Sequence, residues 1–276
     1  MTESIIPAEG EYLTNGWEPD APPEDTLKRR AVLVLASWPI AVATALGCPA
    51  RRTDRWAGAL IGDSGDLTNP VILTQPVPEP DAASLVAEVA ELIPATTVYF
   101  LLNPWLTPDF APYGLALLGH PPLMVRFPGP RPQGDDPEGV RVVEVRDADA
   151  LALAERVLIA GYPMPGSTPG SVLRPGLLDG TTRVWLGYVD GEPVSVAAAH
   201  QAAGATLVEY VAALPAARGR GAGAAVTWAA TLADPEAPAV LVASDDGRPT
   251  YERMGYVSLE RWTGWLRPAK RSLQRR

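Results

Sequence analysis

The feature that most constrains this chain is a glycine-rich turn that joins a strand to a helix. Residues 206–214 are rich in β-branched and apolar side chains, and residues 222–234 carry apolar side chains at helical spacing. Between them stands Arg218-Gly219-Arg220-Gly221-Ala222-Gly223. The first turn of a helix exposes unpaired N–H groups at the positive end of the helix dipole, and glycines let a ligand approach that backbone closely. The turn therefore predicts a site for a phosphate or pyrophosphate.

Two other kinds of phosphate loop fit this sequence poorly. No Gly-x-x-x-x-Gly-Lys-Ser/Thr run occurs, which excludes a Walker loop. Gly219 and Gly221 start a pattern like the dinucleotide fingerprint, but that fingerprint belongs in the first βα unit of a parallel sheet. Here three expected strands precede the turn, and Asp190-Gly191 joins the first two as a hairpin. A nucleotide-binding oxidoreductase is the weaker alternative.

A segment rich in proline, glycine and aspartate divides the chain at residues 128–139. We interpret it as a linker between an N-terminal α/β domain, residues 28–127, and a second domain, residues 140–276. Residues 1–27 are rich in proline and acidic side chains and predict a loosely ordered acidic arm.

The second domain is expected to alternate strands and helices. Expected strands cover residues 140–146, 183–189, 193–200, 206–214, 239–243 and 256–266, and expected helices cover 147–161, 222–234 and 250–254. Such an order predicts an α+β fold with a mixed sheet between helical layers. In the first half we expect helices at 28–47 and 81–93 and strands at 56–61, 70–75, 96–102 and 123–127.

Composition argues against several classes of function. The net charge of -9 disfavours a nucleic-acid partner, which needs clustered Lys and Arg. Two histidines and the single Cys48 make a metal site improbable and an internal disulfide impossible. No signal peptide is evident, and the apolar stretch 31–48 is interrupted by Pro39, so we expect a cytoplasmic protein without a membrane partner.

Two motifs resemble the GCN5-related N-acetyltransferase (GNAT) superfamily. Arg218, Gly221 and Gly223 fit its Arg/Gln-x-x-Gly-x-Gly/Ala signature. Tyr251-Glu-Arg-Met-Gly-Tyr256 is similar to its Tyr-x-x-x-Gly-Phe/Tyr run after the fifth strand. The resemblance covers about residues 140–266. It implies a GNAT fold, acetyl-coenzyme A as cosubstrate without a metal, and transfer of the acetyl group to a primary amine by direct attack in a ternary complex.

The resemblance also implies roles for particular residues. Tyr251 would be the general acid that protonates the leaving thiolate, and Glu209 would be the general base. Coenzyme contacts would come from the strand backbone, from the turn and from the end of the fifth strand. The coenzyme-binding residues expected on this basis are Val211, Ala213, Arg218, Gly219, Arg220, Gly221, Ala222, Gly223, Ala224 and Ser244.

Several questions stay open at this level. The first half has no Arg-x-x-Gly-x-Gly run. We interpret it as a degenerate GNAT-like copy, or as a partial domain that shapes the acceptor pocket. The acceptor is expected to be a small-molecule or peptide amine, and a homodimer is the candidate oligomer. The alternative function is a regulatory or scaffolding module that binds acyl-coenzyme A without turnover.

Overall fold

The computed structural model describes residues 26–62, 68–106, 108–132, 137–162 and 167–268. Nearly all of the expected acidic arm therefore lies outside the described residues. Thr26 marks the start of the ordered fold, because its side chain accepts a hydrogen bond from the Arg29 N–H and caps the first helix.

The strands form two mixed sheets. The first sheet has the order β1-β2-β3-β4-β13-β5, and the second has the order β12-β6-β11-β10-β9-β8-β7. The strands of the first sheet are β1 (Ala50–Arg52), β2 (Trp56–Ala59), β3 (Pro70–Leu73), β4 (Tyr99–Asn103), β5 (Ala116–Gly119) and β13 (Thr263–Arg267). Those of the second are β6 (Pro122–Arg126), β7 (Val140–Glu144), β8 (Thr182–Val189), β9 (Glu192–Ala202), β10 (Ala205–Ala213), β11 (Ala239–Val242) and β12 (Val257–Arg261).

Five α-helices and four short 3-10 helices complete the described fold. The α-helices are α1 (Leu27–Leu46), α2 (Ala82–Leu92), α3 (Ala148–Gly161), α4 (Ala222–Thr231) and α5 (Arg248–Arg253). The 3-10 helices are η1 (Glu79–Asp81), η2 (Ala111–Tyr113), η3 (Pro175–Asp179) and η4 (Pro215–Ala217). The predicted cap of α3 is confirmed, since the Asp147 side chain accepts a hydrogen bond from the Ala150 N–H.

The two halves exchange one strand each. β6 comes from the first half of the chain but lies between β11 and β12 of the second sheet. β13 comes from the end of the chain but lies between β4 and β5 of the first sheet. The segment 128–139 thus separates the two halves in sequence. Each sheet nevertheless contains one strand from the other half of the chain. The expectation of a single strand at 256–266 is wrong, because the chain passes from one sheet to the other at the buried Trp262.

The two halves share a common order of strands and helix. In each half three antiparallel strands lead through a helix to a strand parallel to the third, as in β1-β2-β3-α2-β4 and β8-β9-β10-α4-β11. Each sheet then receives the exchanged strand, and an edge strand follows, β5 or β12. Within the described residues, the first sheet therefore repeats six strands of the second and has no counterpart of β7.

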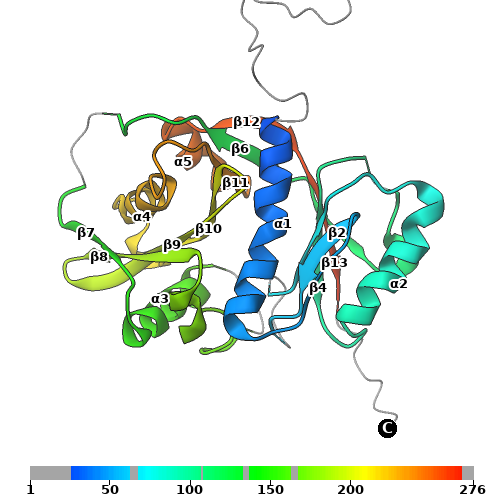
Figure 1. Ribbon diagram of the computed structural model, residues 1–276. Coiled ribbons are helices and arrows are strands. Elements are labelled where there is room, and N and C mark those ends of the chain that lie inside the picture. The colour runs from blue at the N-terminus through cyan, green and yellow to red at the C-terminus, as the bar shows by residue number, and fades with distance from the viewer. Residues whose placement is uncertain (1–25, 63–67, 107, 133–136, 163–166, 269–276) are drawn as a thin grey trace, which may run out of the picture.

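Helix α1 forms a layer shared by both sheets (Figure 1). Its apolar residues, including Val34 and Val42, pack in one cluster with Ala57 and Ile72 of the first sheet and with Leu207 of the second. α3 covers the same face of the second sheet, while α4 covers the opposite face and α2 covers the far side of the first sheet. By length and composition α1 would suit a membrane span, but here it is packed between two sheets.

Candidate active site

The second sheet opens between its two parallel strands. β10 pairs with β11 only at Thr206 and Leu207, although β10 continues to Ala213. The two strands therefore run together at their starts and part beyond Leu207. The edge of β10 that faces this opening keeps backbone N–H and C=O groups for an extended ligand, as the edge strand of a sheet does for a peptide.

A β-bulge shapes β10 at the same place. On the side of β9, Glu209 pairs with Ala198 and Ala212 pairs with Val196, so Tyr210 and Val211 stand opposite one residue. Tyr210 has a φ of +54°, in the left-handed region that non-glycine residues rarely adopt. The bulge takes Tyr210 and Val211 out of the regular pairing with β9 directly after Glu209.

The glycine turn leads from β10 into α4. Gly219 and Gly221 have φ values of +79° and +82°, which only glycine adopts at little cost. Gly221 is the N-cap of α4 and provides no side-chain cap, so the first-turn N–H groups of α4 stay available to a ligand. A Cβ on Gly221 would lie 2.5 Å from Cγ of Pro137, so the turn is closely packed against that proline. The Ser195 hydroxyl donates to the Ala222 carbonyl at 3.0 Å and fixes the start of the helix to β9.

The two arginines of the turn already have partners. The Arg218 guanidinium donates to the Gly161 carbonyl at 3.4 Å, and Arg220 pairs with Asp190 at 2.7 Å. Both side chains are exposed, so each pair is weak and exchangeable. The Arg218 and Arg220 N–H groups donate to the Pro215 and Ala217 carbonyls. The first-turn N–H groups of α4 are therefore the preset anion donors, and the arginines add positive charge around them.

The matching region of the first half has lost these features. β3 and β4 pair at Pro70, Val71 and Ile72, which is most of the length of β3, so no opening forms between them. The turn before α2 contains Pro78, and Glu79 and Asp81 lie where an incoming phosphate would meet the helix. Negative charge at that position disfavours an anion, so this helix start is a poorer anion site than the start of α4.

Glu209, Tyr251 and Tyr162 lie in one region of the fold, because the Glu209 charge acts on both phenols. Burial raises the pKa of the Glu209 carboxyl to about 7, while a hydrogen bond from the Tyr210 backbone opposes that rise. The pKa of Tyr251 is raised by burial, and further by Tyr162 and by the Glu209 charge. The pKa of Tyr162 is raised by burial and by Glu209. One carboxyl and two phenols therefore interact at the bulge.

Short contacts hold Tyr251 and Ser244 in place. A Cβ on Gly247 would lie 3.2 Å from Cε2 of Tyr251, so the Tyr251 ring lies on the Gly247 backbone. Tyr256 packs against the same ring at a centroid distance of 5.9 Å. Ser244 is exposed after β11 and accepts a hydrogen bond from the Gly247 N–H at 3.1 Å, so its hydroxyl orders the turn into α5.

Comparison with known proteins agrees with this geometry. The sequence matches no protein-family model and no curated protein. A GCN5-related N-acetyltransferase from Kribbella flavida has a similar structure, with a TM-score of 0.64 and 22% identity over 88% of this chain and 96% of that chain. The chain has the GNAT fold.

Other solved structures give the same result at lower similarity. A putative GNAT-family acetyltransferase from Novosphingobium aromaticivorans aligns with a TM-score of 0.53 and 18% identity, over 84% of this chain and 97% of that chain. A GCN5-related N-acetyltransferase from Sphaerobacter thermophilus aligns with a TM-score of 0.53 and 13% identity, over 87% and 93%. These alignments cover most of both chains, so the similarity extends over both halves of this chain.

Sequence reasoning missed three residues near the site of this GNAT fold. Tyr162 follows α3 directly, and its signal was an aromatic residue ahead of a loop rich in proline and glycine. Glu155 lies one turn after Leu151 on the apolar face of α3, where a carboxylate is buried only if hydrogen bonds or a charge compensate its lost hydration. Trp38 of α1, in the first half of the chain, contacts Tyr210 in the second half, and no local sequence pattern predicted that contact.

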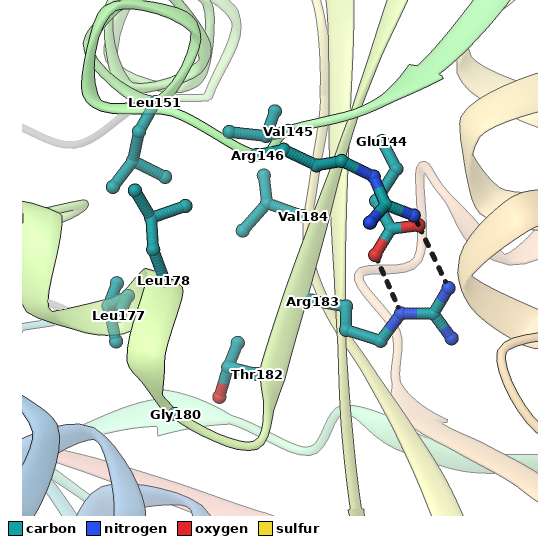
Figure 2. Close-up of a pocket in the computed structure, with 10 residues that line it drawn as sticks. All are labelled: Glu144, Val145, Arg146, Leu151, Leu177, Leu178, Gly180, Thr182, Arg183 and Val184. Carbon is teal, nitrogen blue, oxygen red and sulfur yellow. Dashed lines mark hydrogen bonds and ion pairs between the residues drawn. The ribbon is translucent and has the colours of Figure 1, made fainter.

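One cavity lies beside β8 of the second sheet (Figure 2). It measures about 220 Å³ and is lined by the ion pair of Glu144 with Arg183 and by leucines of α3 and η3. Its Val184 pairs with Ala198 of β9, which pairs with Glu209 of β10. Strand β9 therefore lies between the cavity and the bulge. In the described parts of the chain, no three His, Cys, Asp or Glu side chains gather as a metal-binding group.

Proposed function

We propose that this protein transfers an acetyl group from acetyl-coenzyme A to a primary amine. The observation that carries the proposal is the position of Glu209, a carboxyl with a pKa of about 7, at a bulge beside the opening between β10 and β11. An ordinary strand glutamate would be fully ionised at pH 7 and a weak base. Raising its pKa toward neutrality makes it a stronger base that is still half ionised.

The residues of the opening suit acetyl-coenzyme A, which supplies the reactive thioester. Backbone groups of Val211 and Ala213 along the β10 edge would bind the pantetheine arm. The N–H groups of residues 218–224 would bind the pyrophosphate, because they lie at a helix N-terminus without a side-chain cap. Ser244 lies at the end of β11, on the other side of the opening, and would add a hydroxyl contact.

Glu209 and Tyr251 would handle the two protons of the reaction. The acceptor arrives as an ammonium ion, and Glu209 removes one proton so that the nitrogen lone pair can attack the thioester carbonyl. The carbon–sulfur bond breaks as the carbon–nitrogen bond forms. Tyr251 donates its phenolic proton to the departing sulfur, which its raised pKa allows because the proton stays on the phenol until that step. The second proton that the nitrogen loses restores the Tyr251 phenol. The products are the amide, the free thiol and the proton held by Glu209.

Direct attack fits the position of the single cysteine. The Cys48 sulfur accepts a hydrogen bond from Arg174 at 2.8 Å and contacts the Ile61 carbonyl at 3.9 Å, so its thiol already has partners. We therefore propose a ternary complex rather than an acyl-cysteine. Initial-rate kinetics with both substrates varied should give intersecting lines, and parallel lines would contradict this mechanism.

The test of the function is release of free coenzyme A from acetyl-coenzyme A with a panel of primary amines. Mass spectrometry should show products heavier by one acetyl group. Binding of acetyl-coenzyme A without turnover of any amine would support the alternative, a regulatory or scaffolding module. Cytoplasmic location and a homodimer are our expectations for the same enzyme, to be checked by fractionation and by light scattering.

A further inference from the structure

The acceptor side of the site has a chemical character that points to one class of amine. We propose that the acceptor is a primary amine on an apolar, uncharged body, and that Glu209 is the only acid that receives its ammonium group. This inference rests on the proposed acetyl transfer. It excludes polyamines and amino acids as preferred acceptors.

Aromatic side chains surround the carboxylate. Tyr210 follows Glu209 directly, and Tyr162 and Tyr251 lie close enough that the carboxylate charge acts on both phenols. All three tyrosines are half-buried, and Tyr162 and Tyr210 pack against the same apolar cluster as Trp38. Aromatic rings offer large apolar contact areas, and their faces attract an ammonium group. Such a wall favours an apolar body with one cationic end.

The first half of the chain supports this wall from behind. Trp38 of α1 packs edge-on against Tyr210 with a centroid distance of 5.3 Å. Trp38 is 4% exposed, and its indole nitrogen has no hydrogen-bond partner within the described residues. The aromatic wall formed by Tyr162, Tyr210 and Tyr251 is therefore packed against an apolar side chain, which suits a ligand without further charges.

The second acid near this wall is buried and already hydrogen-bonded. Glu155 of α3 is 2% exposed, and its charge acts on Tyr210. Its two carboxylate oxygens accept hydrogen bonds from three backbone N–H groups, those of Gly170, Val172 and Leu173. This carboxylate holds residues 170–173 against α3, and its burial keeps it out of reach of a second ammonium group. A polyamine would thus find one carboxylate where it needs two.

Two nearby arginines, Arg174 and Arg218, already donate hydrogen bonds to other groups, which disfavours an acceptor with a carboxylate of its own. Arg174 follows the loop held by Glu155 but turns toward the first half, where it donates to the Ile61 carbonyl at 3.2 Å and to the Cys48 sulfur. Arg218 contacts the Gly161 carbonyl and belongs to the turn proposed for the pyrophosphate. An amino acid would therefore meet Glu209 and aromatic rings, with no cation assigned to its carboxylate.

The experiment compares three classes of amine by turnover and by binding. 2-Phenylethylamine and hexylamine represent apolar amines, spermidine represents polyamines, and lysine represents amino acids. We expect kcat/KM for the apolar amines to exceed that for spermidine and lysine at least about 10-fold, as contacts of a few methylenes or one ring allow. Preference for spermidine or lysine would overturn the inference while leaving acetyl transfer intact.

Binding without turnover separates this inference from the function on which it rests. Calorimetry with the full chain and free coenzyme A measures amine affinity in a complex that cannot react. Tighter binding of 2-phenylethylamine than of spermidine supports the inference even if no amine is acetylated, an outcome that would sink only the proposed function. Equal or reversed affinities would overturn it.

Variants at Tyr162 test the wall itself. Tyr162→Ser removes the ring and should weaken 2-phenylethylamine binding about 10-fold, while methylamine, which lacks a body to contact the ring, should change less than about 3-fold. Tyr162→Phe keeps the ring and serves as the matched control, with 2-phenylethylamine affinity near that of the unmodified protein. An equal loss for both amines in Tyr162→Ser would mean that the ring is not part of the wall.

Discussion

Trp38 of α1 packs against Tyr210 of β10, with ring centroids 5.3 Å apart and planes at 66°. The two residues come from different halves of the chain, and Tyr210 is the bulge residue next to the candidate base. A second link lies nearby, where the His200 ring of β9 joins the Ser37 hydroxyl of α1 at 2.9 Å. The first half has lost its own phosphate turn, but its helix supports the site of the second half.

Glu209→Gln should lower kcat by about 10²- to 10⁴-fold, because the amide cannot accept the ammonium proton. In the unmodified protein, kcat/KM should rise with pH up to about 7 and then level, since Glu209 acts only when ionised. The rising limb should be absent from the residual activity of the variant.

Thermal unfolding provides the control for Glu209→Gln. The folded pKa of Glu209 lies above its ordinary value of 4.5, so its contribution to stability is present below that value and is lost as pH rises through about 7. The variant should therefore gain in melting temperature relative to the unmodified protein at pH 8 but not at pH 4. Unchanged activity would refute the role of Glu209 as base.

Tyr251→Phe should reduce kcat at least about 10-fold while leaving acetyl-coenzyme A affinity nearly unchanged, because the proton donated to sulfur is needed only during reaction. Tyr256→Phe is the matched control. Its hydroxyl bonds to Thr231 at 2.6 Å inside the core, so its loss should lower stability by about 1 kcal/mol and spare kcat. Similar kcat values for both variants would contradict the assignment.

Gly221→Ala should weaken acetyl-coenzyme A binding roughly 10-fold, measured by calorimetry, because strain of 1–3 kcal/mol at a left-handed residue must be relieved by moving the turn. The added Cβ would also meet Cγ of Pro137 at 2.5 Å. Gly204→Ala is the control, with a φ of +66° and no atom nearer than 3.9 Å to its added Cβ. It should lose a similar stability but keep the affinity. Equal affinities in the two variants would exclude the turn as the binding site.

The exchanged strands predict that neither half is stable alone. Residues 133–276 expressed alone lack β6, so β11 and β12 lose the strand between them and β13 loses its sheet. We expect this fragment to be insoluble or unfolded by circular dichroism. Coexpression with residues 1–132 should restore a soluble complex that binds acetyl-coenzyme A. A folded, ligand-binding 133–276 fragment would show that the exchange is dispensable.

His200 should make the fold sensitive to acid. Burial lowers the pKa of His200 from 6.5 to about 4. As pH falls, the ring is therefore protonated in the unfolded state while it is still neutral in the folded state. The contribution of His200 to the free energy of unfolding is fully present above pH 6.5 and is lost as pH falls through about 4. The loss amounts to roughly 3 kcal/mol at most. His200→Gln should flatten this dependence in urea titrations between pH 7 and pH 4. An unchanged slope would contradict a neutral buried histidine.

Local signals were enough to predict the phosphate turn and the elements around it. Strand, glycine turn and helix follow one another within residues 205–231, and Asp147 caps its helix through an atom three residues away. Such features depend on side chains that are neighbours in sequence, so propensity and spacing reveal them. The resemblance then led to Glu209 and Tyr251, which the structure brings into one region.

Long-range packing decided the rest. All five residues of β6 are buried, so its sequence carries no alternation that would assign a face or a partner sheet. The same holds for the contact of Trp38 with Tyr210 and for the gathering of Tyr162 with Glu209, which join residues of separate elements. The sequence by itself determined the glycine turn before α4 and the class of fold. Only the tertiary structure decided which strands share a sheet and what surrounds the carboxylate, because both depend on packing between segments far apart in the chain.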